Sequence, residues 1–161
     1  MALPQLIAED VRELDRLLGE LISRSEASSA MIIDKAGFLI TESGSSSSSV
    51  DTTTLAALAA GSFAATQGMA SIVSESNFNC VYQQGESFSL IVQNIEHDTL
   101  LVVVFAAHVS VGAVKYFANS AAPKVAEQLG KARERGDGEL DLAMMNMENS
   151  SEFFRKVAGK D

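Results

Sequence analysis

One uncharged helix constrains this chain more than any other feature. Residues 52–74 contain no charged side chain, and they lie between Asp51, a natural N-cap residue, and Glu75. A surface helix normally carries charged residues on its solvent-facing side, and this segment has none. We nevertheless expect it to be too polar to cross a membrane. The fold must therefore either bury this helix or offer it to a partner.

The side chains of this helix separate by size into two stripes. At 100° per residue the two stripes are about 110° apart. We expect the large residues to pack on the chain's own domain and the small residues to let a foreign backbone approach. A chain of 161 residues is barely large enough to wrap the helix completely, which favours a protein–protein interface. The large stripe contains Leu55, Leu58, Ser62, Ala65, Met69 and Ile72, and the small stripe contains Ala57, Gly61, Ala64, Gly68 and Ser71.

Charge and cysteine content exclude several classes of function. The net charge of −9 argues against nucleic acids and anionic membranes as partners, because both require a basic patch. The single cysteine, Cys80, forms no intramolecular disulfide and fits a reducing compartment. No basic region leads into an apolar run at the N-terminus, and residues 99–107 are too short to span a bilayer. These features predict a soluble cytoplasmic protein.

The periodicity of apolar residues predicts an α+β domain. Helical spacing covers residues 6–26 and resumes near residue 110, and Pro123 should kink that last helix or break it between 120 and 123. The resulting five-stranded antiparallel sheet should carry the uncharged helix on one face and the terminal helices on the other. We expect a domain over 1–132, followed by a polar linker and a short C-terminal segment over 133–161. The predicted strands are 30–34, 38–42, 79–84, 87–95 and 99–106, with a polar loop at 44–49.

Three segments of the chain resemble the roadblock/dynein light-chain family, and most closely its bacterial MglB-type branch. They are IIDKAGFLI, DTTTLAALAAGSFAA and LLVVVFAAHVSVGAVK, and the similarity spans roughly residues 28–129. The resemblance implies a roadblock-like α/β/α sandwich that forms a homodimer, with third strands paired edge to edge and second helices side by side. It also implies a small Ras-like, MglA-type GTPase as partner, bound in its GTP state and stimulated in GTP hydrolysis. The resemblance further implies a role in bacterial cell polarity or motility and a location at a cell pole.

The resemblance also assigns roles to individual residues, all by their positions in this sequence. It implies GTPase contacts from the second helix, a dimer seam from that helix and the third strand, and a tail contact to the partner. The expected GTPase-binding residues are Ala57, Ala60, Gly61, Ala64, Ala65 and Gly68. The expected dimer residues are Ala56, Phe63, Gln67, Cys80, Val81 and Tyr82, and the expected tail contacts are Phe153 and Phe154.

We expect no catalytic, cofactor or metal site. The chain has no GxxxxGK[ST] phosphate-binding loop, and its two histidines, His97 and His108, lack an acidic or cysteine cluster at ligand spacing. Its serines lack a convincing base, and Cys80 lies in a predicted strand, where most cysteines are small apolar residues.

No arginine occurs between Arg24 and Arg133, so the uncharged helix cannot supply an arginine finger for GTP hydrolysis. An activator of this kind would clamp the GTPase's own residues into position. Otherwise an arginine from a terminal segment must reach the nucleotide, and the candidates are Arg12, Arg16, Arg133 and Arg135.

Two other functions remain open from the residues alone. The same dimer could be a non-catalytic scaffold that holds a GTPase or another roadblock protein without changing turnover. A small-molecule sensor with a similar antiparallel sheet would need a cavity with convergent polar groups. The sequence shows no such polar group of residues, because Leu90, Val92, Val102 and Val104 resemble an ordinary core.

Overall fold

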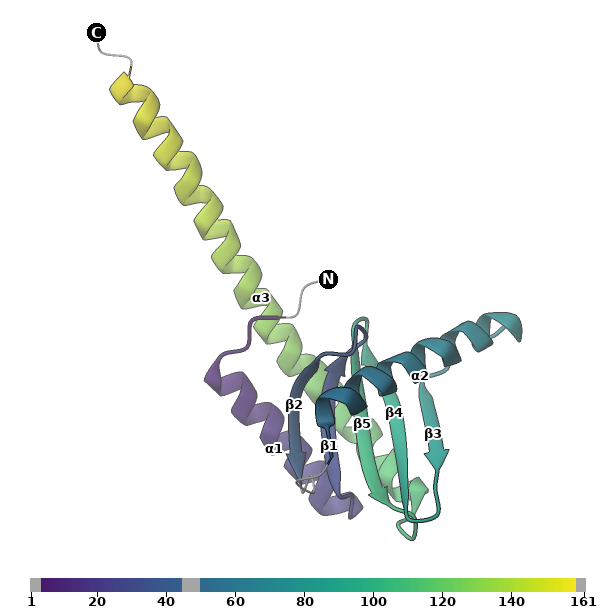
Figure 1. The fold of residues 1–161 in the computed structure, drawn as a ribbon. Helices are drawn as coiled ribbons and strands as arrows, with labels where there is room; N and C mark the ends of the chain where they lie inside the picture. Colours follow the sequence, from purple (N-terminus) through teal and green to yellow (C-terminus); the bar gives the residue numbers. More distant parts are fainter. Residues whose placement is uncertain (1–3, 45–49, 159–161) are drawn as a thin grey trace.

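The computed structural model describes residues 4–44 and 50–158, with side chains described as far as residue 136. It has the predicted element order and is an α+β fold built on one antiparallel sheet (Figure 1). The predicted loop at 44–49 lies largely outside the described residues, because only Gly44, the last residue of β2, belongs to them. The elements are α1 (Ala8–Ser25), β1 (Ser29–Asp34), β2 (Leu39–Gly44), α2 (Thr52–Ile72), β3 (Cys80–Gln84), β4 (Phe88–Glu96), β5 (Thr99–Ala106) and α3 (Val111–Ala158).

The five strands lie in the order β2-β1-β5-β4-β3, and all neighbours are antiparallel. β5 is the central strand, as its apolar residues on both faces predict. Its Leu101 pairs with Ile32 of β1, and its Val102 pairs with Val92 of β4. β2 and β3 are the two edges of the sheet.

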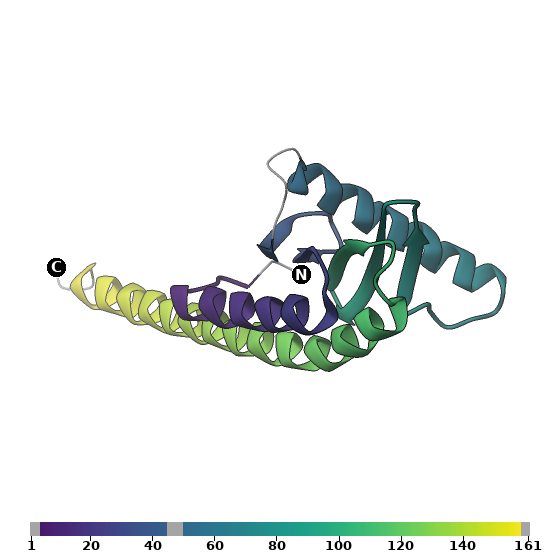
Figure 2. The ribbon, with the colours of Figure 1, turned by 90° about the horizontal axis from the view of Figure 1, so that it is seen from below.

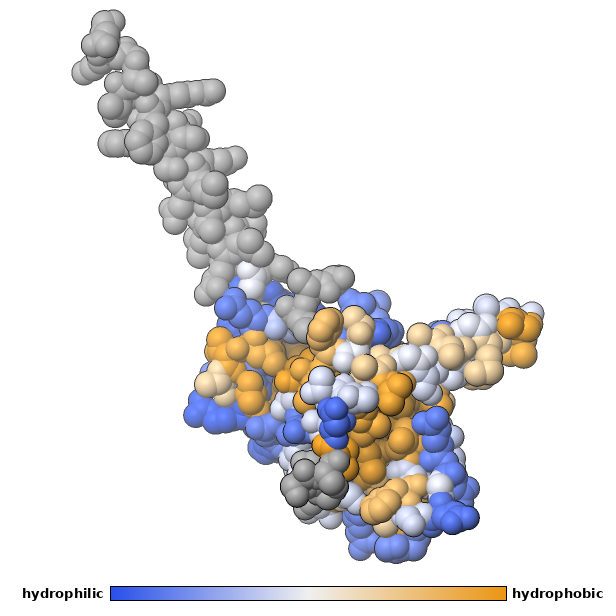
Figure 3. Space-filling view, in the orientation of Figure 1, coloured by the Kyte–Doolittle hydropathy of each residue, from blue (hydrophilic) through white to orange (hydrophobic). Residues whose placement is uncertain are grey.

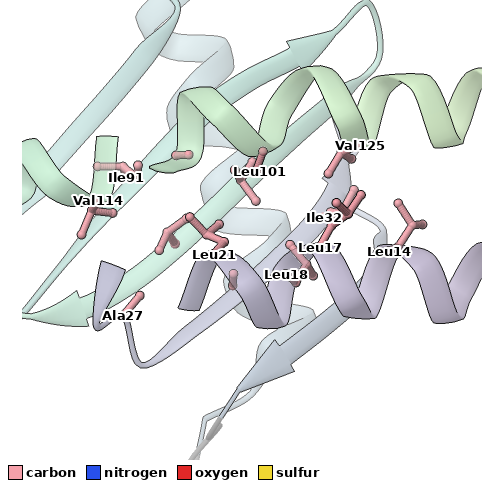
Figure 4. Packing of buried hydrophobic residues seen from close by; sticks show 14 of the residues in the cluster. Leu14, Leu17, Leu18, Leu21, Ala27, Ile32, Ile91, Leu101, Val114 and Val125 are labelled. Atoms are coloured by element: carbon pink, nitrogen blue, oxygen red, sulfur yellow. The ribbon is translucent and has the colours of Figure 1, made fainter. Parts of the chain in front are cut away.

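The helices form a layer on each face of the sheet, which gives the predicted sandwich (Figure 2). α1 and α3 lie side by side on one face, and their leucines and valines meet the inward residues of β1, β4 and β5 (Figure 4). α2 alone covers the other face, where a smaller cluster forms around Phe63. The fold therefore has one thick core and one thin core.

α3 is longer than the sequence suggests, and the predicted break at Pro123 is wrong. The helix continues through Pro123, which lies on its solvent-exposed side. Proline removes one backbone hydrogen bond, at a cost of about 3 kcal/mol. The neighbouring Ala121, Ala122 and Val125 are buried and hold the helix in place across this position.

The predicted polar linker after residue 133 is also helical, since α3 continues to Ala158. Residues 139–148 are rich in Glu, Leu, Ala and Met, which favour helix formation and outweigh the nearby Gly136 and Gly138. The expected C-terminal segment is therefore the end of α3 and not a separate helix. The proposed domain boundary at 132/133 lies within this helix and stays a prediction.

A buried carboxylate fixes the start of α1 to α3. Asp10 is fully buried, accepts the Ile7 N–H at 2.9 Å and the Gln128 amide at 2.7 Å, and pairs with Arg135. Burial alone would raise the pKa of Asp10, but these three hydrogen bonds and the charge of Arg135 together lower it. The carboxylate thus remains charged and joins the two helices of the thick core.

Candidate protein interface

The buried side of α2 consists mainly of alanine. Ala56, Ala59, Ala60, Phe63 and Ala70 are buried, and the first four pack on the sheet in the thin core. Alanine side chains bring the helix backbone close to the strands, so a single aromatic ring fills the remaining space. The expectation that the large stripe packs on the chain's own domain is therefore wrong.

The large stripe instead lies mostly in solvent. Leu58 is 66% exposed, Met69 is 56% exposed and Ile72 is 82% exposed, whereas Leu55 is half-buried. The whole small stripe is exposed as well. We call Leu58, Gly61, Ala65, Gly68, Met69 and Ile72 the outer face of α2. This face is apolar, carries no charge, and is unusual for a helix surrounded by water.

The glycines of the outer face leave open space around the helix. A side chain added at Gly61 or Gly68 would meet no atom within 4 Å. The two residues are therefore not required by packing within the chain. Their small size instead permits the close approach of another molecule's backbone.

At its other flank, α2 rests on the turn between β1 and β2. Gly37 in this turn has a φ of +97°, and a β-carbon placed there would lie 2.9 Å from the Ala57 α-carbon. Glycine is needed here both for the backbone conformation and for the close approach of the helix.

The N-terminus of α2 is capped as predicted. Asp51 accepts the Thr54 backbone N–H at 3.0 Å and also the Thr54 hydroxyl. These hydrogen bonds hold the pKa of Asp51 below its usual value. The Asp51 carboxylate is thus occupied at the N-terminal end of the helix.

α2 extends beyond the sheet edge formed by β3 (Figures 1 and 2). Met69 and Ile72 lie in this final part of the helix. The following loop is tied back to the helix, because the Gln67 amide donates to the Phe78 carbonyl at 2.6 Å. The helix therefore presents apolar side chains past the last strand of its own sheet.

The sheet face beside α2 is only partly covered. Phe88 is 60% exposed, and Leu90 and Val104 are half-buried, although alternation places them on the same face as the buried Val92. Figure 3 shows apolar surface over the strands below α2. Because α2 crosses the sheet diagonally, it leaves this half of the thin core open.

The two edges of the sheet differ in how they are protected. β2 contacts α1, its pairing with β1 contains a bulge, and Thr41 donates a hydrogen bond to Asp15 at 2.8 Å. β3 pairs with β4 in regular register and contains no charged residue or proline along CVYQQ. Bulges and charges are the usual protection against edge pairing. β3 therefore remains open to another strand.

Most of the expected GTPase-binding residues are accessible, since Ala57, Gly61, Ala64, Ala65 and Gly68 are all exposed. Ala60 is buried against the sheet and offers little side-chain surface to a partner. A binding role for these positions stays a prediction.

The expected dimer residues divide between core and edge. Ala56 and Phe63 are buried in the thin core, and their assignment to a dimer seam stays a prediction. Cys80 and Val81 are half-buried, and Tyr82 is partly exposed and stacks on Phe105. Burial raises the pKa of the Cys80 thiol, although Lys115 opposes this, so the residue behaves as a small apolar group.

The expected tail contacts lie outside the residues whose side chains the structure describes. Phe153 and Phe154 belong to the α3 backbone, but their side chains are beyond the described part of the chain. Sequence reasoning did not find the exposed Phe88, because its alternation with Leu90 and Val92 is that of a buried face. The spacing of Ala56, Ala59, Ala60 and Phe63 was the available signal for the true packing side of α2.

Among the described residues no group of His, Cys, Asp and Glu is arranged to hold a metal ion. In the described part of the chain, α2 is the one helix long and apolar enough to cross a membrane by length and composition, so the expectation that it is too polar to do so is not confirmed. Its alanine side is packed on the sheet.

Comparison with known proteins agrees with this geometry. Residues 13–105 match the model of the Roadblock/LC7 domain. A structure described as MglB with tetrameric arrangement has a TM-score of 0.76 and 29% identity, over 80% of this chain and 96% of that one. The gliding protein MglB from Thermus thermophilus has a TM-score of 0.73 and 28% identity, over 80% and 96%.

Myxococcus xanthus MglB has a TM-score of 0.70 and 29% identity, over 78% of this chain and 96% of that chain. A comparison with curated protein sequences finds no match. The family match covers more than half of the chain, and the fold agrees with that of the similar MglB structures. The chain therefore belongs to the Roadblock/LC7 domain family.

Proposed function

We propose that this protein is a homodimeric regulator of a small Ras-like GTPase of the MglA type, which it binds in the GTP state and stimulates in hydrolysis. The observation that carries the proposal is the outer face of α2, which is exposed, apolar and free of charge. We also propose a role in bacterial cell polarity or motility at a cell pole, and similarity to an MglB structure described as a gliding protein supports motility.

The dimer follows from three features on one side of the molecule. β3 has an open edge, α2 extends past it, and the sheet beside α2 is partly uncovered at Phe88, Leu90 and Val104. A twofold axis through paired β3 strands would bring the end of each α2 over its partner's sheet. Met69 and Ile72 would then cover apolar surface that a monomer leaves in water.

The GTPase would lie on the exposed small residues of α2. Ala57, Gly61, Ala64 and Gly68 permit close approach of a partner's backbone, and no long side chain must be moved aside. The absence of charge means that binding leaves no unpaired buried ion on this side.

The positions of the arginines support clamping of the GTPase's own residues. Arg16 pairs with Glu13 at 2.7 Å, Arg133 with Glu96, and Arg135 with Asp10. These arginines, and Arg12 in α1, belong to the helical layer on the opposite face of the sheet from α2. An arginine finger from this layer would have to pass around the domain to reach a GTPase on α2.

The charge-free surface also favours a second candidate, a scaffold that binds the GTPase without changing turnover. Such a surface offers no group to the charge of a transition state. The two functions need the same binding site and differ only in its effect on the GTPase.

Single-turnover hydrolysis by an MglA-type GTPase, with and without this protein, separates the two candidates. A parallel binding assay would compare the GTP and GDP states. Binding selective for GTP together with faster hydrolysis is the expected result. Selective binding with unchanged hydrolysis would assign the scaffold role. The absence of binding in either state would contradict both candidate functions.

A further inference from the structure

α3 continues well beyond the helix that covers it. α1 lies antiparallel along α3, with Asp10 bonded to Gln128 at one end and Arg24 over the Phe117 ring at the other. α1 begins at Ala8, whereas α3 runs to Ala158 and projects from the domain (Figures 1 and 2). We call residues 137–158 the α3 extension, which is about 33 Å long at 1.5 Å per residue.

A helix of this kind is marginal on its own. Most of the stability of a helix in a protein comes from packing of its apolar side and not from helix propensity. Gly136 and Gly138 lie at its start, and each costs about 1 kcal/mol relative to alanine. We therefore expect a partner helix to stabilise the extension along its length.

The apolar register of α3 continues into the extension. In the covered part the buried positions follow a spacing of three and four residues, through Val114, Ala118, Ala121, Val125 and Ala132. The same register continues through Gly136 to Leu140, Ala143, Met147, Phe154 and Val157. The apolar series of α3 that packs on α1 and the sheet thus continues, in sequence, into the part of α3 that lies beyond the first residue of α1.

Apolar residues at the start of α1 are exposed beside this point. Ile7 is 45% exposed, although it directly precedes α1, and Val11 in the first turns is also exposed. Asp10, between them, pairs with Arg135 immediately before the extension. A helix lying along the extension would reach both apolar residues.

The charges of the extension identify its partner. Its first part is acidic, and its end is basic with Arg155 and Lys156, followed by Lys160. An antiparallel pair of such helices brings each basic end beside an acidic start. The acidic residues of the first part are Asp137, Glu139 and Asp141, whereas Glu148 and Glu152 lie in the second half, before the basic end.

We propose that the α3 extension pairs antiparallel with the α3 extension of a second copy of this chain. A twofold axis near Met147 aligns the register position of Phe154 with that of Leu140, and of Arg155 with that of Glu139. The end of the partner's helix then lies beside Ile7 and Val11. Exposed apolar surface at the start of α1 is covered by the same contact.

This contact is separate from the surface around α2. α3 leaves the domain on the β2 side, whereas the open edge is β3 on the other side of the sheet (Figure 1). Pairing through the extension therefore joins copies by a second twofold axis. It does not depend on the proposed GTPase function.

Two full-length charge variants test the pairing, with molar mass measured by light scattering after size exclusion. The first carries Asp137→Lys, Glu139→Lys and Asp141→Lys, which makes both ends of the extension basic. The second carries Arg155→Glu and Lys156→Glu, which makes both ends acidic. Each variant alone should show at least a twofold lower mass than the wild type, and an equimolar mixture should recover the wild-type mass.

Lys124→Glu is the matched control, because Lys124 is exposed on the covered part of α3 and should leave the mass unchanged. Wild-type mass for both variants would overturn the proposal, and so would a mixture that fails to reassemble. Unchanged mass together with weaker GTPase binding would show that the extension binds the GTPase, and this result would also overturn self-pairing. Recovery in the mixture cannot arise from variants that have simply unfolded.

Discussion

The two helical layers of this domain cover the same sheet in opposite ways. α1 and α3 bury leucines and valines and place ion pairs such as Arg16–Glu13 and Lys131–Glu127 in solvent. α2 buries alanines and exposes Leu58, Met69 and Ile72 without any charge. The first layer is complete within the chain, whereas the second leaves large apolar side chains exposed to solvent.

The largest effect on stability is expected in the complete layer. Leu18→Ala removes a fully buried side chain between α1 and the sheet, and it should lower the free energy of unfolding by about 2–5 kcal/mol. Denaturant unfolding measures this value. A loss below about 1 kcal/mol would show that the thick core does not dominate the stability of the domain.

A smaller loss is expected where α2 touches the sheet most closely. Gly37→Ala imposes a positive φ on alanine and places its β-carbon against the Ala57 backbone, which should cost about 2 kcal/mol. Thermal unfolding of the variant and of Gly19→Ala, a helical site with open space, gives the comparison. Equal stability of the two variants would contradict the close contact at Gly37.

The buried carboxylate of the complete layer should make stability depend on pH. The folded state lowers the pKa of Asp10, so its contribution is present above the unfolded value near 4 and is lost as pH falls through the folded pKa. Asp10→Asn should lower the free energy of unfolding at pH 7 by about 1–2 kcal/mol. The free energy of unfolding of Asp10→Asn should also fall less steeply than that of the wild type below pH 5. Parallel curves of unfolding free energy against pH would contradict the role of the Asp10 carboxylate.

In the incomplete layer, a drastic substitution should have the smallest effect on stability. Ile72→Glu changes a residue that is 82% exposed, so the free energy of unfolding should stay within about 0.5 kcal/mol. Homodimer affinity should nevertheless fall by more than tenfold, because the glutamate would be buried against the partner's sheet. Sedimentation equilibrium measures the dissociation constant of the homodimer. Unchanged affinity would show that the end of α2 does not lie in the dimer contact.

Local patterns were sufficient to predict most of the fold. The run TLLVVVFA identified the central strand because both of its faces are apolar, and Asp51 identified the start of α2. Pro123 misled the prediction, since a penalty of about 3 kcal/mol is outweighed by the buried neighbours that hold α3. The sequence gives the local cost of such a residue but not the packing that opposes it.

The packing side of α2 could not be predicted from residue size. Large residues are usually buried, so Leu58 and Ile72 were expected to face the sheet. The alanines are buried because they let the backbone approach, and this preference depends on the distance between two elements that are far apart in sequence. The exposed small stripe agrees with expectation, while its partner stays a prediction.

The most direct test of the central claim is a binding measurement with two matched glycine substitutions. Gly68→Arg places a charged side chain on the outer face of α2, and Gly19→Arg places the same side chain on α1 in the complete layer; both sites have open space. If α2 binds the GTPase, Gly68→Arg should keep the fold and lose at least tenfold in affinity for the GTP-bound MglA-type GTPase, while Gly19→Arg binds like the wild type. Equal affinity of the two variants would contradict the assignment of α2 as the partner-binding helix.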